Sequence, residues 1–346
     1  MINIYTINFV SIIFYYILVS IANRYVKKIE NFFYCIASMQ LFLLVALRNN
    51  SVGTDTYRYC EYFEGIRFFG YTKEFGYGFL MKGINFFSSD YRVFLFITAA
   101  LSIIPICIFI YKTSSNAFIS LLIYISFFYN FSFSGIRQSI ALSFLVGAVS
   151  VYFNKPKLSL ILIFIATSFH YSSMVFLCIY FKRYLNVFLN KISILSSFVI
   201  AIFFLSPTIG EFFIKFFYSD YTISQWGSDN YMLFSTGILS LYLFFVLKLN
   251  LHKNFSNTEK LSFFSMQIAF ILFPTISHIS NALRLVNIFY FFSTIGFVKI
   301  ISFFDTTSKL IIQIFVITFL LSFYVYLTAF TGDLLRLHPY TTYLSR

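Results

Sequence analysis

The chain has 346 residues and a formal net charge of +13; 59% of its residues are hydrophobic and only 11% are charged. A mean hydropathy of +0.82, with uncharged segments spread over the whole length, excludes a soluble globular protein. We expect an all-α, polytopic membrane protein, because a helix satisfies its own backbone polar groups in lipid. The positive charge falls mostly in short basic loops of the kind that orient membrane helices, so a nucleic-acid partner is not expected.

The apolar runs set the expected number of membrane spans at about ten, since a helix needs about 20 residues to cross a bilayer. In chain order the runs lie at 4–22, 31–47, 93–111, 117–133, 136–153, 192–209, 231–249, 261–277, 284–303 and 310–330. The first is expected to stay as a span, because no basic region precedes it and no clear cleavage site follows it. We expect one transmembrane domain over residues 1–346, with both ends outside.

Two further apolar pieces are not simple spans. The piece 75–88, FGYGFLMKGINFFS, is short and contains three glycines and a lysine, which predicts a helix lying at the membrane interface or dipping into it. The piece 157–183 is long enough for one span, but polar residues interrupt its centre: Thr167, Ser168, His170, Ser172 and Ser173.

The positive-inside rule decides between two topologies for the piece 157–183. As one span, it would place the basic loops 182–191 and 248–260 outside. As a re-entrant pair of half-helices with His170 at its tip, it places nearly all basic loops on the cytoplasmic side. We favour the re-entrant pair, and we expect His170 to face a wet cavity near the outer face, because non-helical backbone at that depth needs such surroundings.

Arginines on the outward side are candidates for binding an anion. Arg137 and Arg284 each stand at the start of a predicted span, and Arg48 begins the outer loop 48–92. A guanidinium at that level can bind a phosphate group in a bidentate manner while its stem rests on apolar side chains. The alternative is that each arginine snorkels to the interface or pairs with a carboxylate.

Other outward groups are candidates for proton transfer or sugar binding. Asp55 follows Gly53 in VGTDTY, so a turn can present its carboxylate to a sugar hydroxyl, with Tyr57 beside it; an Asx turn or a helix cap is the alternative. His170 is a candidate base because the unperturbed pKa of histidine is near neutral, although a buried histidine that bonds a carbonyl would look the same. His278 has less to distinguish it.

A set of short segments resembles a known family. In chain order these are RNNSVGTDTYRY, KEFGYGFL, SGIRQSIALSF, SFHYSSMVFL, the arginine of NALRLVNIFYF, and the terminal HPY. Together they resemble the EpsG branch of the Wzy-type polysaccharide (O-antigen) polymerases over nearly the whole chain. The resemblance implies a GT-C-like protein of the bacterial inner membrane that extends a glycan on undecaprenyl pyrophosphate at the periplasmic face. It carries over to Arg48, Asp55, Glu74, Arg137, Gln138, His170, Arg284 and Tyr340.

The expected reaction is a glycosyl transfer that needs no cofactor and no metal. Arg137 and Arg284, assisted by Arg48, would stabilise the charge on the departing pyrophosphate, and the chain has no Asp-x-Asp metal signature. Asp55 or His170 would be the base. The residues expected to position sugars are Glu74, Gln138 and Tyr340, and Tyr57 and His278 are further candidates for binding the substrate. The expected partners are a lipid-linked oligosaccharide, membrane lipid and a chain-length regulator protein; whether the product is O-antigen lipopolysaccharide, capsule or exopolysaccharide stays open.

Three other functions fit a polytopic chain with outward arginines. A flippase of lipid-linked glycans would need access from both faces, whereas the polar groups gather on one side. An O-antigen ligase usually has a large outer loop in its C-terminal half, which the stretch 210–230 does not provide. A membrane acyltransferase would need an acyl donor.

Overall fold

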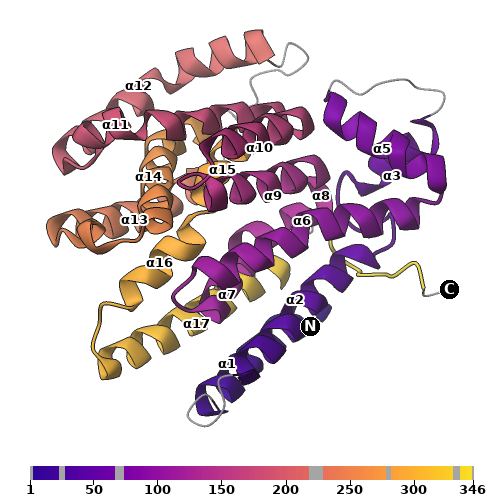
Figure 1. Cartoon of the computed structure of the whole chain (residues 1–346), viewed down its shortest axis with the longest axis horizontal. Helices are drawn as coiled ribbons and strands as arrows, with labels where there is room; N and C mark the ends of the chain where they lie inside the picture. Colours follow the sequence, from indigo (N-terminus) through magenta and orange to yellow (C-terminus); the bar gives the residue numbers. More distant parts are fainter. Residues whose placement is uncertain are drawn as a thin grey trace. The chain divides into compact units, whose positions relative to one another are not determined.

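The computed structural model describes residues 3–22, 28–66, 74–217, 229–277, 282–329 and 336–344, and these residues are almost entirely helical (Figure 1). Among these residues β-type pairing is limited to an isolated antiparallel bridge between Arg48 and Thr342. The contacts divide the chain into two compact units, Met1–Tyr171 with Ile301–Arg346, and Ser172–Ile300.

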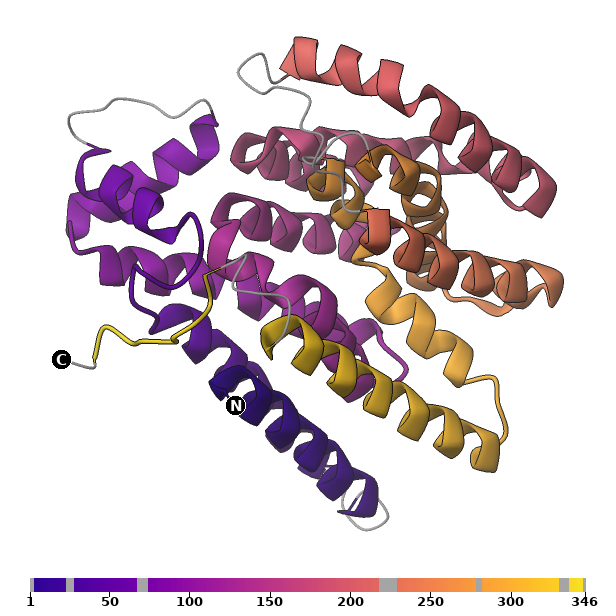
Figure 2. The same ribbon diagram turned by 180° about the vertical axis from the view of Figure 1, so that it is seen from behind.

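The first unit combines the N-terminal half of the chain with its C-terminal helix. Its elements are α1 (Ile4–Ala22), α2 (Lys28–Ala46), α3 (Thr56–Glu64), α5 (Phe75–Phe87), α6 (Tyr91–Thr113), α7 (Ala117–Tyr124), the π-helical η1 (Ile125–Tyr129), α8 (Phe131–Ser134), α9 (Ile136–Val151), α10 (Pro156–Phe169) and α17 (Thr306–Ala329). Asp90 caps α6 and Asn116 caps α7, each accepting a backbone N–H of the first turn, which fixes where these helices begin. Figure 2 shows α17 beside α1. The rings of Phe9 on α1 and Tyr324 on α17 stack, with their centroids 4.9 Å apart.

The outer surfaces of several helices in this unit are apolar. Phe14 and Ile21 of α1 and Ile314 and Phe315 of α17 are exposed large side chains, although both helices also bury a face against the unit. A soluble protein does not leave such long apolar surfaces in water, whereas lipid accepts them. The described helices therefore belong to a multi-pass membrane protein.

The count of about ten spans is not confirmed. Among the described residues, five helices are long and apolar enough to cross a membrane, and a bent pair raises the number to six. Four shorter apolar helices, Ala117–Tyr129, Ile136–Val151, Pro156–Phe169 and Leu233–Lys248, coincide with runs that the sequence predicted as spans or half-spans. The first three end at a turn or a cap residue before a bilayer's length is reached, whereas Leu233–Lys248 is the C-terminal part of a 20-residue helix, Asp229–Lys248.

The predicted interruption at His170 is present. Helix α10 ends at Phe169, and His170 has extended backbone, with φ −154° and ψ 112°. The chain bends strongly about 20 residues after His170, where the segments Tyr171–Leu189 and Ile192–Ile202 meet at 111°. The segment before that bend carries Lys182 and Arg183, whose charges favour an aqueous boundary over the bilayer interior.

The predicted interfacial helix is α5, and it is amphipathic. Tyr77, Met81 and Ile84 are buried, while Phe79 and Phe86 are among its most exposed side chains. The two faces follow the helical repeat of 3.6 residues, so one face packs on the unit and the other presents phenylalanine outward.

The loop after α2 is tied to the C-terminal segment 336–344. Asn49 N–H donates to the Thr341 carbonyl at 2.8 Å, and Gly53 N–H donates to the Arg336 carbonyl at 2.8 Å. Gly53 has φ +101°, and a Cβ there would come 2.5 Å from the Phe133 carbonyl oxygen, so this turn requires glycine. The two segments are joined by backbone hydrogen bonds although nearly the whole chain separates them.

The second unit is also helical. Its elements are the 3₁₀ segment η2 (Tyr171–Phe181), α11 (Lys182–Leu189), α12 (Ile192–Phe217), α13 (Asp229–Lys248), η3 (Leu251–Asn254), α14 (Asn257–Leu272), η4 (Phe273–Ser277), α15 (Ala282–Tyr290) and α16 (Ser293–Ile301). A capping box of Ser256 and Glu259 begins α14, and Glu259 also pairs with Lys299 of α16 at 3.0 Å.

Candidate active site

Three of the predicted site residues meet in the first unit around one carboxylate. Glu74 stands at the N-terminus of α5, Arg137 lies in the first turn of α9, and His170 follows α10. Arg137 Nη1 donates to Glu74 Oε2 at 2.6 Å, and Glu74 Oε1 lies 3.0 Å from His170 Nδ1. The Tyr171 backbone N–H also donates to Oε1, at 3.3 Å. We call Glu74, Arg137 and His170 the ion-pair array.

The local sequence explains how the array assembles. Gly135 ends α8 and begins α9, which places Arg137 in the first turn of its helix. The end of α10 at Phe169 leaves His170 free of helical backbone, so its side chain and the next N–H both reach Glu74. Gly76 lies against Ser168, and this close approach of α5 to α10 sets the distance across the array.

The array is largely removed from solvent. Glu74 and His170 are each 5% exposed, whereas the Arg137 side chain is 32% exposed. Burial by itself would raise the pKa of the Glu74 carboxyl, but the hydrogen bond from His170, the charge of Arg137 and the Tyr171 N–H together bring that pKa below its usual value. Glu74 is therefore ionised at neutral pH, and its charge offsets that of Arg137.

The same contact fixes the proton on His170. A carboxylate only accepts hydrogen bonds, so Nδ1 carries the proton that faces Glu74. In the neutral ring, Nε2 is then the unprotonated nitrogen. It is buried and has no hydrogen-bond partner in the part of the chain that the structure describes. The arrangement leaves a lone pair on Nε2 with the opposite side of the ring held in place, which suits a general base.

Two tyrosines beside Arg137 were not anticipated from the sequence. Arg137 Nε donates to the Tyr59 hydroxyl at 3.2 Å, and its guanidinium carbon lies 5.6 Å from the Tyr59 ring centroid and 6.0 Å from that of Tyr77. The only signal was positional: Tyr59 lies in the segment RNNSVGTDTYRY and Tyr77 in KEFGYGFL. In a chain with 27 tyrosines that signal is too weak to single them out.

Arg48 has contacts of a structural kind. It is 1% exposed, its Nη1 donates to the Val45 carbonyl, and its Nη2 donates to the Phe133 carbonyl at 3.3 Å. Burial lowers the pKa of Arg48 to about 10, so the guanidinium stays protonated at neutral pH. These contacts join the end of α2 to α8 and favour a structural role for Arg48 in holding the outer loop. The expected assistance of Arg48 at the pyrophosphate stays a prediction.

The first unit holds four other predicted site residues: Asp55, Tyr57, Gln138 and Tyr340. Asp55 occupies the N-cap position of α3 but makes no side-chain cap hydrogen bond, and Tyr57 is exposed on that helix. Tyr340 donates to the Leu44 carbonyl at 2.9 Å, and burial raises its pKa to about 12. Gln138 is buried one residue after Arg137.

The remaining two predicted residues belong to the second part of the chain. Arg284 lies in the first turn of α15 and is half-buried. His278 lies outside the described residues. The expected cooperation of Arg284 with Arg137 stays a prediction, because the two residues belong to different compact units.

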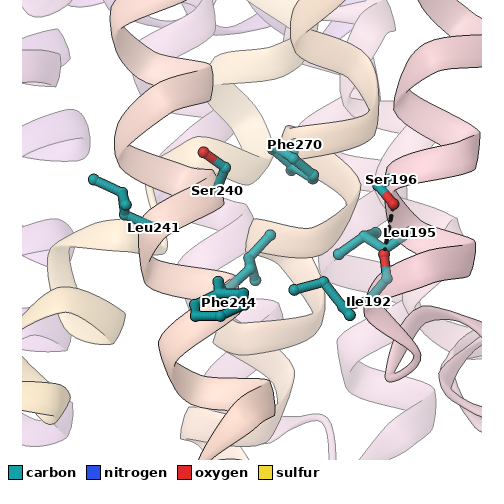
Figure 3. Close-up of a pocket in the computed structure, with 8 residues that line it drawn as sticks. Ile192, Leu195, Ser196, Ser240, Leu241, Phe244 and Phe270 are labelled. Atoms are coloured by element: carbon teal, nitrogen blue, oxygen red, sulfur yellow. Dashed lines mark hydrogen bonds between the residues drawn. The ribbon is translucent and has the colours of Figure 1, made fainter.

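A cavity in the second unit offers a contrast to the array. It measures about 320 Å³ and lies between α12, α13 and α14 (Figure 3). Its lining is apolar apart from two serines, and Ser196 and Ser240 donate to the Ile192 and Gly237 carbonyls of their own helices.

Among the described residues, no group of three His, Cys, Asp or Glu side chains could hold a metal ion.

Comparison with models of known protein families identifies the family of this chain. The EpsG family model matches residues 31–342, which is nearly the whole chain. The chain belongs to the EpsG family. The match includes every segment on which the resemblance rested, and it indicates a polysaccharide polymerase-like membrane protein. No curated protein and no solved structure matches this EpsG-family chain, so the GT-C-like fold is not confirmed.

Proposed function

We propose that the protein is a glycosyltransferase that polymerises a polysaccharide by joining repeat units carried on undecaprenyl pyrophosphate. The observation that carries the proposal is the Glu74 carboxylate bridging Arg137 and His170, with Nε2 of the histidine unpaired. A cation for a phosphate leaving group and an oriented base are the two groups that such a transfer needs. Membership of the EpsG family supports the same reaction class.

In the proposed step, a sugar hydroxyl of one lipid-linked unit attacks the anomeric carbon of the glycan on another. The new bond forms between that hydroxyl oxygen and the anomeric carbon. The bond from the anomeric carbon to the pyrophosphate oxygen breaks, and its electron pair leaves with the lipid pyrophosphate. His170 Nε2 takes the hydroxyl proton, and Glu74 stabilises the imidazolium that results.

Arg137 has the second role. Its guanidinium is partly exposed, so it can contact the pyrophosphate as charge develops there. Protonation of His170 changes the net charge of the array from zero to +1, because Glu74 already offsets Arg137. The array thus gains positive charge in the same step in which the leaving group gains negative charge. The assignment of Arg284 to a pyrophosphate stays a prediction from the sequence.

We place this chemistry at the periplasmic face of the bacterial inner membrane. The basic loops on the other side of the predicted spans support that orientation. No divalent ion enters the proposed step, since the arginines supply the positive charge.

The proposal is tested in a deletion strain complemented with variants of the full chain. Arg137→Ala and His170→Ala should leave lipid-linked single repeat units made but not joined, seen as loss of the surface-glycan ladder. Arg92→Ala is the matched control, because Arg92 is an exposed arginine that pairs with Asp90. Long chains of normal length from either array variant would contradict the proposal. Long lipid-linked chains that are not transferred onward would indicate a ligase instead.

A further inference from the structure

Tyr77 carries a buried hydroxyl without a partner. The residue is 1% exposed on α5, and among the described residues its hydroxyl has no hydrogen-bond partner. An unsatisfied buried hydroxyl destabilises a protein, whereas phenylalanine would fill the same space without that cost. Other buried tyrosines of the described residues, Tyr324 among them, share this feature, so the surroundings of Tyr77 decide whether its hydroxyl has a ligand.

Tyr77 lies beside the ion-pair array. Its ring centroid lies 6.0 Å from the Arg137 guanidinium carbon, and it follows Glu74 by three residues on one helix. His170 Nε2 is a second buried atom without a partner, and it belongs to the same array. Two unsatisfied polar atoms at one charged cluster indicate groups held ready for a ligand.

The Arg137 guanidinium has N–H donors beyond those that bind Glu74 and Tyr59. Its Nη1 and Nε atoms hydrogen-bond Glu74 and Tyr59, and no bond of its Nη2 atom to a described residue is seen. A guanidinium N–H and a phenol O–H are both donors, and phosphate oxygens are acceptors that carry negative charge. Arg137 Nη2 and the Tyr77 hydroxyl are thus two donors, on neighbouring side chains, of the kind that a phosphate oxygen accepts.

We propose that the Tyr77 hydroxyl is a substrate-binding group that shares a phosphate oxygen of the lipid pyrophosphate with Arg137. This inference rests on the proposed function. Phe94 contacts the Tyr77 ring and is fully buried, whereas Tyr59 contacts it edge-on at 5.7 Å and is half-buried. The phosphate therefore approaches from the side of Tyr59 and the exposed part of Arg137, and the Tyr59 ring turns aside to admit it.

The test compares stability with binding in the purified full chain. Tyr77→Phe removes only the hydroxyl, so its melting temperature without ligand should equal or exceed that of the wild type. Undecaprenyl pyrophosphate should raise the melting temperature of both proteins, but Tyr77→Phe should need about tenfold more, as expected for loss of one hydrogen bond to a charged group. Inorganic pyrophosphate should give the same ratio, and phosphatidylglycerol should give no shift.

Tyr324→Phe is the matched control. Tyr324 is a fully buried tyrosine of α17 whose hydroxyl also lacks a partner among the described residues, and it stacks on Phe9. This variant should gain stability like Tyr77→Phe while its pyrophosphate affinity stays that of the wild type.

Several outcomes would overturn the inference. These are wild-type affinity in Tyr77→Phe, a lower melting temperature for Tyr77→Phe without ligand, equal losses of affinity in the control, or an equal shift with phosphatidylglycerol. The readout is binding, so it separates the two proposals: pyrophosphate binding that depends on Tyr77 would stand even if the deletion strain still made long chains.

Discussion

Gly76 lies against Ser168 so closely that a Cβ atom on Gly76 would come 2.1 Å from the Ser168 hydroxyl oxygen and 3.1 Å from the Ser168 carbonyl carbon. The second of these atoms is backbone and cannot rotate away. The contact brings the start of α5 against the end of α10, two residues from Glu74 on one side and two from His170 on the other. The geometry of the ion-pair array therefore depends on Gly76, a residue without a side chain.

Gly76→Ala should push α5 away from α10 and lengthen the contact between Glu74 and His170. We expect loss of chain joining in the complementation assay and a fall in stability of about 1 to 3 kcal/mol, the usual cost of overpacking. The matched change is Gly83→Ala on the same helix, where nothing lies within 4 Å of a Cβ. That variant should keep activity and gain up to about 1 kcal/mol from helix propensity. Equal behaviour of the two variants would contradict this account.

Glu74→Gln should remove the negative charge that offsets Arg137 while keeping the shape of the side chain. The folded-state pKa of the Glu74 carboxyl lies below its usual value of 4.5, so the stability that its charge contributes is full above that value. It is lost as the pH falls through the lowered pKa. The wild type should thus be more stable than the variant by about 1 to 3 kcal/mol at neutral pH, and this difference should shrink below about pH 4.5. Melting temperatures of the purified chain across pH 3 to 7 measure it.

The control for this change is Glu259→Gln in the second unit. It breaks the ion pair with Lys299, so it should also lower stability. It should leave chain joining intact, whereas Glu74→Gln should abolish it. Retained joining in Glu74→Gln would show that the carboxylate charge is not needed.

Arg48→Lys should separate a structural role from a role in anion binding. Lysine keeps the positive charge but cannot reach both carbonyls with a planar fork, so the variant should lose about 1 to 3 kcal/mol of stability. Joining per folded molecule should stay near that of the wild type. A variant with wild-type stability and weakened pyrophosphate binding would instead support the assignment of Arg48 to the pyrophosphate.

Chain joining by the purified protein should continue in excess EDTA. The reason is that guanidinium groups supply the positive charge that stabilises the leaving pyrophosphate. The measurement is the length of the glycan formed from lipid-linked repeat units with EDTA and with added Mg²⁺ or Mn²⁺. A requirement for either ion would contradict the proposed step.

The positions of many helices could be predicted from the sequence. The run 4–22 is α1, the run 93–111 lies within α6, and the run 310–330 is nearly all of α17. Hydrophobicity and helix-ending residues act locally, so they can be read along the chain. The break at His170 was predictable for the same reason, because a run of polar residues interrupts an apolar helix.

The candidate site was predictable only as a set of residue types. The sequence pointed to Arg137, Glu74 and His170 separately. It predicted Glu74 as a sugar-binding group and Arg48 as a further arginine at the pyrophosphate. Nothing local indicated that Glu74 holds both of the others, that Arg48 bonds two carbonyls, or that Tyr59 and Tyr77 contact the guanidinium.

Composition and order along the chain by themselves determined the membrane class and the helical segments, because burial in lipid places demands on every residue in turn. The order of short polar segments determined the EpsG resemblance. Tertiary structure alone decided which polar groups became partners. Residues 74, 137 and 170 meet only because α5, α9 and α10 pack together, and Gly76 lets two of those helices approach. Side-chain partners depend on that packing, which no single segment of sequence encodes.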